Sequence, residues 1–195
     1  MPRTEFQYIL FAVLELRSYR KPDVPRDIAV QIVSGVRFVW PQFFGRTPPL
    51  WESTPYPPDG MHFVMVDGDL LISHVLVTSR KLAHAAETFN VYGLSSVFTY
   101  PTHRGTGCGE KTVAAATDYL KKQVDADFAL LFCGERVKSM YLRQGWEVVP
   151  GMKIQFGPDN QTYADGYCLT LYVSQRARAH RFVESEPLHV GKNTW

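Results

Sequence analysis

The sequence predicts an α/β fold, with a mixed, mostly antiparallel central sheet and helices on both faces. Two apolar segments, 61–66 and 70–79, flank Asp67-Gly68, a dipeptide typical of a tight hairpin turn, and a third strand-like segment follows at 89–99. Segment 128–133 is wholly apolar, as a central parallel strand is, and it lies between two segments with helical spacing. Antiparallel strands that lead into a strand-helix-strand-helix crossover make a mixed sheet.

The N-terminal part predicts a strand followed by a helix. Residues 8–14 are apolar but far too few to span a membrane, and Glu15 follows them without a small-residue cleavage site. We therefore expect a buried strand in a protein that is neither secreted nor inserted in a membrane. The next segment predicts a helix that Asp23 can cap, because apolar residues recur at every fourth position until Pro41: Ile28, Ile32, Val36 and Trp40.

Residues 41–58 combine prolines with aromatic side chains, and we expect this segment to be mostly irregular because proline removes backbone hydrogen-bond donors. We interpret it as a wall that packs against its own domain and borders a binding pocket. Alternatively, Pro55-Tyr56-Pro57-Pro58 is a polyproline ligand for a partner protein.

The second half of the chain predicts two helices and three strands. Helical spacing follows the strand at 89–99, with apolar residues at Val113, Ala116, Leu120 and Val124, and a second helix is expected at 135–144 before Gly145. Besides 128–133, we expect strands at 146–149 and 167–173, joined by a long loop. The tail, 176–195, is polar, and its basic half, with Arg176, Arg178 and Arg181, is interpreted as a solvated face rather than a nucleic-acid patch.

Composition indicates one globular domain over residues 1–195, in which residues 150–195 form a C-terminal strand and tail. The chain has 45% hydrophobic and 21% charged residues and a formal net charge of +2, so it offers no global field for nucleic acid or an anionic membrane. The three cysteines and six histidines form no cluster with metal-site spacing, so we predict no metal, and a reducing cytoplasm fits the cysteine usage.

The run 104–109, Arg-Gly-Thr-Gly-Cys-Gly, follows a strand and opens a helix, which is the setting of a backbone anion site. The first amides of a helix lack partners and lie at the positive end of its dipole, so a phosphate placed there is stabilised without a cationic side chain. The spacing excludes a P-loop, because Glu110 precedes Lys111 where that motif requires glycine, and it also departs from the GxGxxG dinucleotide fingerprint.

The run Val97-Phe98-Thr99-Tyr100-Pro101-Thr102-His103 followed by 104–109 resembles the acetyl-CoA motif of the Gcn5-related N-acetyltransferases. The stretch Tyr141-Leu142-Arg143-Gln144-Gly145-Trp146 is similar to the second signature of that superfamily, and the resemblance spans about 60–149. It implies that acetyl-CoA lies in a cleft where the sheet splays between 89–99 and 128–133. The implied cofactor residues are Val97, Phe98, Thr99, Arg104, Gly105, Thr106, Gly107, Cys108 and Gly109.

The resemblance also implies catalytic roles. Acetyl transfer needs a proton for the departing thiolate, and Tyr141 occupies the superfamily position for that acid. Within the superfamily, the aminoglycoside 2'-N-acetyltransferases are most similar, through Gly60-Met61-His62, Asp165-Gly166 and the final Trp195. Where those enzymes carry an acidic residue before the strand end, this chain has Ser95, so the base does not transfer. Ser95 could orient a water instead, and His74 or Glu87 could approach from neighbouring segments.

The missing acids point to an acceptor with few positive charges. Those relatives also carry an acidic residue two positions before the terminal tryptophan, where this chain has Asn193. We therefore expect a low-charge aminoglycoside such as kasugamycin, acetylated on a primary amine with resistance as the outcome, and bound by Asp159, Asp165 and Trp195. The alternatives are acetylation of a protein N-terminus, a lysine or a small metabolic amine, and a non-catalytic acyl-CoA sensor. A homodimer is a further expectation.

Overall fold

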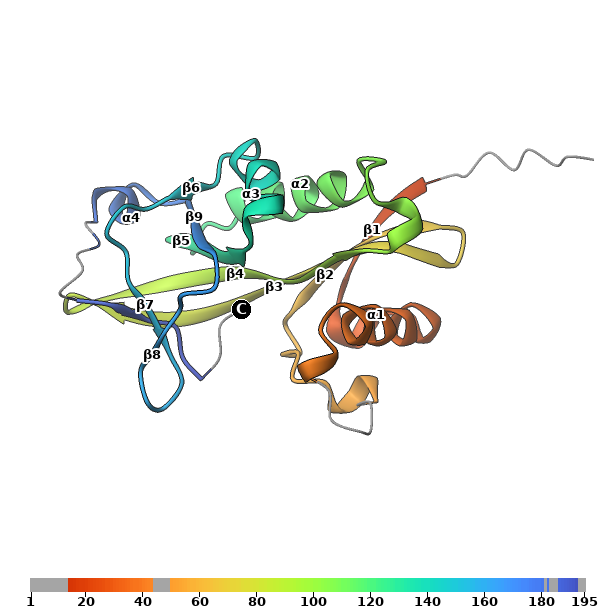
Figure 1. The fold of residues 1–195 in the computed structure, drawn as a ribbon, viewed down its shortest axis with the longest axis horizontal. Helices are drawn as coiled ribbons and strands as arrows, with labels where there is room; N and C mark the ends of the chain where they lie inside the picture. Colours follow the sequence, from red (N-terminus) through yellow and green to blue (C-terminus); the bar gives the residue numbers. More distant parts are fainter. Residues whose placement is uncertain (1–13, 44–49, 181, 183–185, 193–195) are drawn as a thin grey trace, which may run out of the picture.

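The computed structural model describes residues 14–43, 50–180, 182 and 186–192 of the chain. In this part, a seven-stranded sheet has the order β1-β2-β3-β4-β5-β9-β6 (Figure 1). All its neighbouring strands are antiparallel except the parallel pair β4–β5, which confirms the predicted mixed, mostly antiparallel sheet. The strands are β1 (Leu14–Arg20), β2 (Met61–Asp67), β3 (Leu70–His84), β4 (Glu87–Thr99), β5 (Phe128–Cys133), β6 (Glu147–Val148) and β9 (Tyr167–Tyr172).

Helices cover both faces of this sheet, as the sequence predicts (Figure 1). On one face lie α2 (Cys108–Lys121) and α3 (Glu135–Leu142), and on the opposite face lies α1 (Arg26–Val39). A small sheet of β10 (Leu188–His189), β7 (Ile154–Phe156) and β8 (Gln161–Thr162) lies on the α1 side but under the other end of the main sheet. The remaining elements are α4 (Gln175–Ala179), η1 (Lys21–Asp23), η2 (Pro41–Phe43), η3 (Trp51–Ser53) and η4 (Pro101–His103).

The four-residue spacing in α1 places its apolar side chains on one stripe that faces the sheet. Ile28, Ile32 and Val36 are buried and pack against Val64 and Leu71 of the hairpin. Asp23 does not cap this helix as expected. It lies in η1, and Pro25 occupies the N-cap position without a side-chain hydrogen bond.

The first strand lies later in the chain than the sequence indicates. Residues 8–13 of the predicted strand lie outside the described part, and β1 begins at Leu14, where that prediction ends. This strand pairs with β2 at the edge of the sheet, and its Leu14 and Leu16 are more than 40% exposed rather than buried. An edge strand needs no apolar run, because only part of its surface meets the core.

In the tail, Arg176 and Arg178 are exposed as predicted and Arg181 lies outside the described residues, but the rest of the tail also contributes buried apolar side chains. Phe182, Leu188 and Val190 are buried and join Phe89 and Phe128 in a hydrophobic cluster that α4 also contacts through Ala177. The long loop before β9 likewise contains β7 and β8, which the sequence analysis missed. Strands of two or three residues are too short to show a period of two, so their pairing with β10 is invisible in the sequence.

The sheet opens between β4 and β5. These two strands pair only from Val91–Phe128 to Leu94–Leu131, although β4 continues to Thr99 and β5 to Cys133. Beyond Leu94, β4 remains paired with β3, and the last residues of β5 remain paired with β9. The backbone edge of β4 that faces β5 therefore has no strand partner over residues 95–99, which is the splay that the sequence resemblance implies.

Candidate active site

The glycine-rich run forms a tight turn between the end of β4 and the start of α2. Gly105 and Gly107 adopt positive φ angles of 78° and 82°, a conformation that side chains with a Cβ rarely tolerate. Gly107 is the N-cap residue of α2, and its carbonyl accepts the first helical hydrogen bond from the Lys111 amide. Among the described residues, no acceptor pairs with the amides of residues 105–110, so these donors are free at the positive end of the helix dipole.

The surroundings of this turn fit a polyphosphate. A Cβ built on Gly105 or Gly107 would meet no described atom within 4 Å, so the space above both residues is open. Gly109 has a different role, because its Cβ would lie 2.5 Å from Oγ1 of Thr99, and the absence of a side chain lets α2 approach the end of β4. The Arg104 side chain turns back, and its Nε donates to the Thr99 carbonyl at 3.0 Å.

One acidic residue stands in this anion site, and an ion pair neutralises it. Glu110 lies in the first turn of α2, where a carboxylate would repel a phosphate. The Arg143 guanidinium donates to both carboxylate oxygens at 3.1 Å, and this pairing holds the pKa of Glu110 below its ordinary value. Both side chains are exposed, so the pair contributes little to stability, but it leaves the turn without net negative charge.

Two of the expected cofactor residues could contribute only their backbone. The Cys108 side chain is 2% exposed and clusters with Met65 and Ile72, so its thiol is unavailable to a ligand. The Phe98 ring is buried on the opposite face of the sheet, where it packs so closely on Gly35 of α1 that a Cβ there would clash with it. Val97 and Thr99 lie on the unpaired edge of β4 described above.

Tyr141 lies in the last turn of α3, on the same face of the sheet as α2. Its side chain is 4% exposed and packs in the cluster that contains Leu131 and Cys133 at the end of β5. Burial, and to a lesser degree the nearby Cys133, raises the pKa of Tyr141, so its hydroxyl stays protonated at neutral pH. No described residue hydrogen-bonds this hydroxyl, which leaves its proton available to a ligand at the splay.

A β-bulge distorts β4 immediately after its pairing with β5 ends. Leu76 of β3 is opposite Ser95, but His74 is opposite Phe98, so β4 contains one residue more than β3 over this interval. Ser96, within the bulge, has a positive φ of 49°, a conformation that costs about 1 kcal/mol or more in a residue with a Cβ. Ser95 is half-buried beside the bulge, and since it lies opposite Leu76, it faces the same side of the sheet as His74.

Polar contacts around this bulge involve residues that the sequence analysis did not place together. The hydroxyls of Tyr56 and Ser96 are 3.2 Å apart, and Nδ1 of His74 lies 2.8 Å from the Ser96 carbonyl oxygen. Nε2 of His74 lies 2.9 Å from Nδ1 of His62. From the sequence, His74 was expected only as a residue that could approach the site, and His62 was named only within the resemblance at Gly60-Met61-His62.

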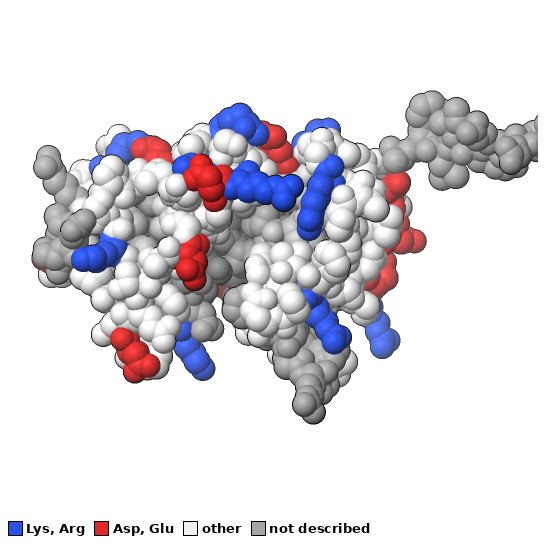
Figure 2. All heavy atoms as spheres, in the orientation of Figure 1, with Lys and Arg blue, Asp and Glu red and all other residues white. Residues whose placement is uncertain are grey.

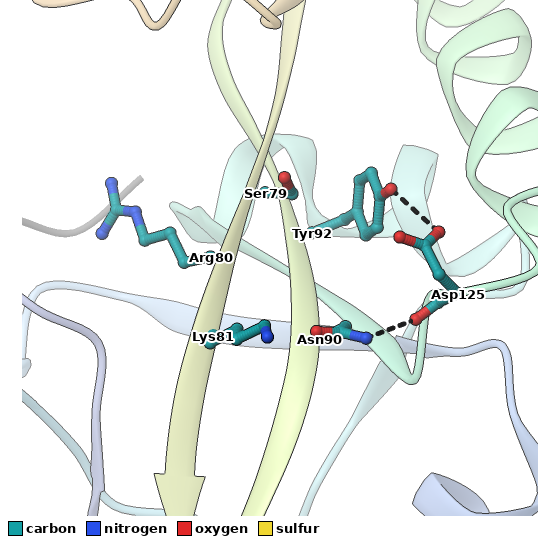
Figure 3. Close-up of a pocket in the computed structure, with 6 residues that line it drawn as sticks. All are labelled: Ser79, Arg80, Lys81, Asn90, Tyr92 and Asp125. Carbon is teal, nitrogen blue, oxygen red and sulfur yellow. Dashed lines mark hydrogen bonds between the residues drawn. The ribbon is translucent and has the colours of Figure 1, made fainter.

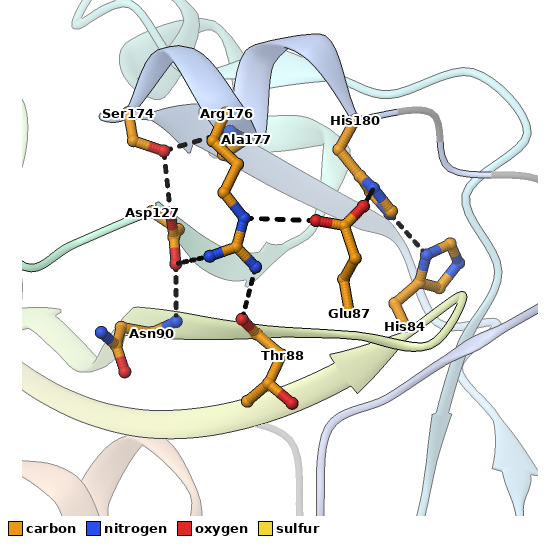
Figure 4. A network of polar contacts seen from close by, with 9 residues as sticks. All are labelled: His84, Glu87, Thr88, Asn90, Asp127, Ser174, Arg176, Ala177 and His180. Carbon is orange, nitrogen blue, oxygen red and sulfur yellow. Dashed lines mark hydrogen bonds and ion pairs between the residues drawn. The ribbon is translucent and has the colours of Figure 1, made fainter.

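Glu87, Asp159 and Asp165, the other predicted catalytic or substrate-binding residues that the structure describes, do not join this group. Glu87 is at the start of β4, eight residues from Ser95 and so roughly 26 Å away along an extended strand. There it contacts Arg176 and His180 in a network that ties α4 to the β3–β4 hairpin (Figure 4). Asp159 lies in the exposed connection between β7 and β8, and Asp165 is exposed just before β9.

The loop of Asp165 does reach the open end of the sheet. A Cβ on Gly166 would lie 2.5 Å from the Cys133 carbonyl, and Tyr163 packs edge-on against Phe132 with ring centroids 4.6 Å apart. These contacts place the loop at the end of β5, on the far side of the splay from β4. Trp195 and Asn193 lie outside the described residues.

A separate hollow of about 300 Å³ lies over β3 and β4 near the loop that leads into β5 (Figure 3). In it, the Tyr92 hydroxyl donates to the Asp125 carboxylate at 3.1 Å, and Asn90 donates to the Asp125 carbonyl at 3.0 Å. Arg80 and Lys81 also border it. It contains neither the free amides nor the unpaired strand edge, so it is not the expected cofactor cleft.

The comparisons with known proteins agree with this geometry. Residues 33–149, more than half of the chain, match the family model described as an acetyltransferase (GNAT) domain. The chain belongs to the GNAT acetyltransferase family. It is an acetyl-CoA-dependent N-acetyltransferase, and acetyl-CoA is its cosubstrate. The comparison with curated protein sequences found no match.

Solved structures show the same fold at low sequence identity. The Escherichia coli GNAT protein YhbS in complex with CoA has a TM-score of 0.55 at 12% identity, over 90% of this chain and 88% of that one. Arabidopsis thaliana NAA60 in complex with acetyl-CoA has a TM-score of 0.58 at 13% identity, over 82% of this chain and 98% of that one. A protein of Enterococcus faecalis V583 has a TM-score of 0.56 at 16% identity. The match covers 70% of this chain but only 32% of that longer protein.

Further features of the described residues concern membrane helices, cysteines, metal-ligating groups and surface charge. No helix in the described ranges is long and apolar enough to cross a membrane. All three cysteines are free thiols, and the described residues contain no group of three or more metal-ligating side chains. Figure 2 shows basic and acidic side chains interspersed on the visible face, without a large basic patch of the kind that binds nucleic acid.

Proposed function

We propose that this enzyme acetylates a primary amine of a small molecule, specifically a low-charge aminoglycoside antibiotic such as kasugamycin. The observation that carries the proposal is the neutral character of the group at the β4 bulge. Ser95, Ser96 and Tyr56 carry no charge there, and burial keeps His62 and His74 neutral by lowering the pKa of each, to about 2 and about 4. A site for polycationic aminoglycosides would need carboxylates beside the reacting amine.

The proposed cosubstrate site combines the two backbone features described above. The free amides of residues 105–110 would hold the pyrophosphate, and the unpaired edge of β4 around Val97 and Thr99 would pair with the amides of the pantetheine arm. Bound there, acetyl-CoA supplies an activated acetyl group as a thioester. Arg104 supports the site by fixing the end of β4 through its bond to Thr99.

Two side chains would then assist proton transfer, one on each face of the sheet at the splay. Tyr141 approaches from the α3 face with its hydroxyl protonated, and it would give that proton to the departing sulfur. Ser95 faces the other side, where the acceptor amine would arrive, and its hydroxyl would orient a water that takes the amine proton. The segment 50–58, anchored by Lys21 through the carbonyls of Thr54 and Tyr56, would form the acceptor-side wall.

Three further expectations belong to this proposal. The exposed carboxylates of Asp159 and Asp165, together with Trp195, would recognise the few ammonium groups of the acceptor. The free thiols are compatible with a cytoplasmic enzyme. A homodimer is also part of this proposal, and each copy would contain its own cleft between β4 and β5.

A thiol-release assay with acetyl-CoA tests the acceptor class. The panel contains kasugamycin, kanamycin as a more highly charged aminoglycoside, and a short peptide with a free N-terminus. We expect turnover with kasugamycin and much less with kanamycin. Absence of turnover with both antibiotics would overturn the antibiotic proposal, and turnover with the peptide alone would favour protein acetylation. Tight acetyl-CoA binding without thiol release from any amine would instead indicate a sensor.

A further inference from the structure

Two buried histidines beside the β4 bulge have no part in the mechanism above. His62 on β2 and His74 on β3 are both 0% exposed. They form a chain of two hydrogen bonds that ends on the Ser96 carbonyl: His62 Nδ1 to His74 Nε2 at 2.9 Å, and His74 Nδ1 to the Ser96 oxygen at 2.8 Å. This oxygen belongs to the bulge residue with positive φ.

The carbonyl at the end of the chain determines where each proton lies. A carbonyl oxygen can only accept, so His74 must carry its proton on Nδ1. Burial lowers the pKa of His74 to about 4, so at neutral pH the ring has no second proton and its Nε2 is an acceptor. His62 must therefore donate from Nδ1, and it too is neutral, since burial, with smaller effects of His74 and Lys21, lowers its pKa to about 2.

The other end of the chain confirms this direction of donation. Nε2 of His62 is buried and has no hydrogen-bond partner among the described residues. The ring is enclosed by Trp51 and Tyr56, with centroid distances of 5.1 and 5.5 Å. A neutral ring that donates from Nδ1 leaves an unprotonated Nε2, and an unpaired lone pair costs less in this enclosure than a buried positive charge would.

A second histidine pair in the molecule has different end groups. Nδ1 of His84 lies 2.6 Å from Nε2 of His180, and Nδ1 of His180 lies 3.3 Å from the Glu87 carboxylate (Figure 4). The other ring nitrogen of His84 contacts the Glu186 carbonyl, so that pair meets an acceptor at both ends. The pair at the bulge has an acceptor at one end only, so two protons suffice and no charge enters the site.

We propose that His62 and His74 are positioning residues, which hold the Ser96 carbonyl on the β3 side and thereby keep the β4 edge turned toward the splay. The inference rests on the proposed placement of the pantetheine arm along residues 95–99. The bulge begins after Ser95, one residue beyond Leu94, which is the last residue of β4 that pairs with β5. Without the His74 donor, Ser96 can relax its strained backbone, and the amides and carbonyls that follow rotate away from the cosubstrate.

Substitutions at His74 test this role through the position of one N–H group. Asparagine places an amide N–H near the original Nδ1, so His74→Asn keeps the bond to the Ser96 carbonyl. Glutamine places its N–H near the original Nε2, so His74→Gln keeps a polar side chain but loses that bond. Calorimetry measures binding of acetyl-CoA and of its nucleotide half, adenosine 3'-phosphate 5'-diphosphate, which needs the turn at 104–109 but not the β4 edge.

We expect His74→Gln to weaken acetyl-CoA binding about tenfold, and His74→Asn to remain within about threefold of wild type. Binding of the nucleotide half should stay within about twofold in both variants. A loss of folded protein would instead lower the active fraction for both ligands equally. The control is His84→Leu, which removes a buried histidine from the far end of the same strand and should leave both affinities unchanged.

Equal acetyl-CoA affinities in His74→Asn and His74→Gln would overturn this proposal while leaving the cosubstrate site intact. If wild type binds neither ligand, the proposed cosubstrate site fails and the positioning role fails with it. Nitrogen-15 NMR of the imidazoles gives a second readout that needs no ligand: both rings should be neutral and protonated on Nδ1 at pH 7. Protonation of His74 on Nε2 would contradict the inferred chain.

Discussion

At the scale of single residues, the site depends on atoms that lack partners rather than on charged side chains. Among the described residues, the amides of residues 105–110 have no acceptor, and the Tyr141 hydroxyl makes no hydrogen bond on the other side of the splay. Glu110, the one acidic residue of the turn, is neutralised by Arg143. A polyphosphate can therefore bind to a chain whose net charge is only +2.

Tyr141→Phe tests the proposed acid. The ring remains in its cluster with Leu131 and Cys133, and the hydroxyl makes no hydrogen bond to a described residue, so folding and acetyl-CoA affinity should change little. Turnover with an active amine of the acceptor panel should fall about a hundredfold or more, because the departing thiolate loses its proton donor. Steady-state kinetics and calorimetry separate the two effects, and unchanged turnover would exclude Tyr141 as the acid.

At the scale of elements, register decides what the site contains, and the sequence predicts elements better than register. The strand at Phe128–Cys133 is predicted to the residue, and the hairpin around Asp67-Gly68 and the helix after the glycine-rich run are all present. The resemblance also correctly implies the splay. The bulges in β3 and β4 were not predicted, because nothing in an apolar strand marks the residue at which pairing shifts.

The bulge in β3 explains why His62 and His74 could not be placed together from the sequence. Near the turn, Val66 is opposite Leu71. If this register continued, His62 would be opposite Val75, and His74 would lie on the other face of the sheet from His62. One extra residue, Ile72, shifts the pairing so that Met65 is opposite Ser73. A shift of one residue exchanges the two faces of a strand, and it brings both histidines to the α1 face.

The tail elements make a second prediction at this scale. Leu188 of β10 is fully buried in the cluster that contains Phe89 and Phe128, so Leu188→Ala should lower the free energy of unfolding by about 2–4 kcal/mol. Leu70→Ala is the matched control, since Leu70 is 54% exposed, and it should cost less than about 0.5 kcal/mol. Chemical denaturation measures both. Equal small losses would contradict the packing of Leu188 in this cluster.

At the scale of the whole molecule, the buried histidines couple stability to pH. Burial lowers the pKa of His62 and His74 below the value of about 6.5 that each has in the unfolded chain. Below pH 6.5 the unfolded state therefore binds more protons than the folded state, and stability falls as the pH falls. From pH 7 to pH 5, each histidine should cost about 2 kcal/mol.

Urea denaturation at pH 7 and pH 5 measures this loss. His74→Asn removes one of the two titrating groups while keeping the donor to Ser96, so its stability should fall by about 2 kcal/mol less than that of wild type over the same interval. An identical pH dependence in the two proteins would show that His74 is not held neutral by the fold.

Calorimetric titration of acetyl-CoA into Gly107→Val tests the central claim, that the turn opening α2 is the cosubstrate site, most directly. The matched control is Gly68→Val in the β2–β3 turn, since both glycines have positive φ and no described atom within 4 Å of a Cβ, so both substitutions impose similar backbone strain. We predict that Gly107→Val abolishes measurable binding in a folded protein and that Gly68→Val binds like wild type. Retention of binding in Gly107→Val would contradict the account.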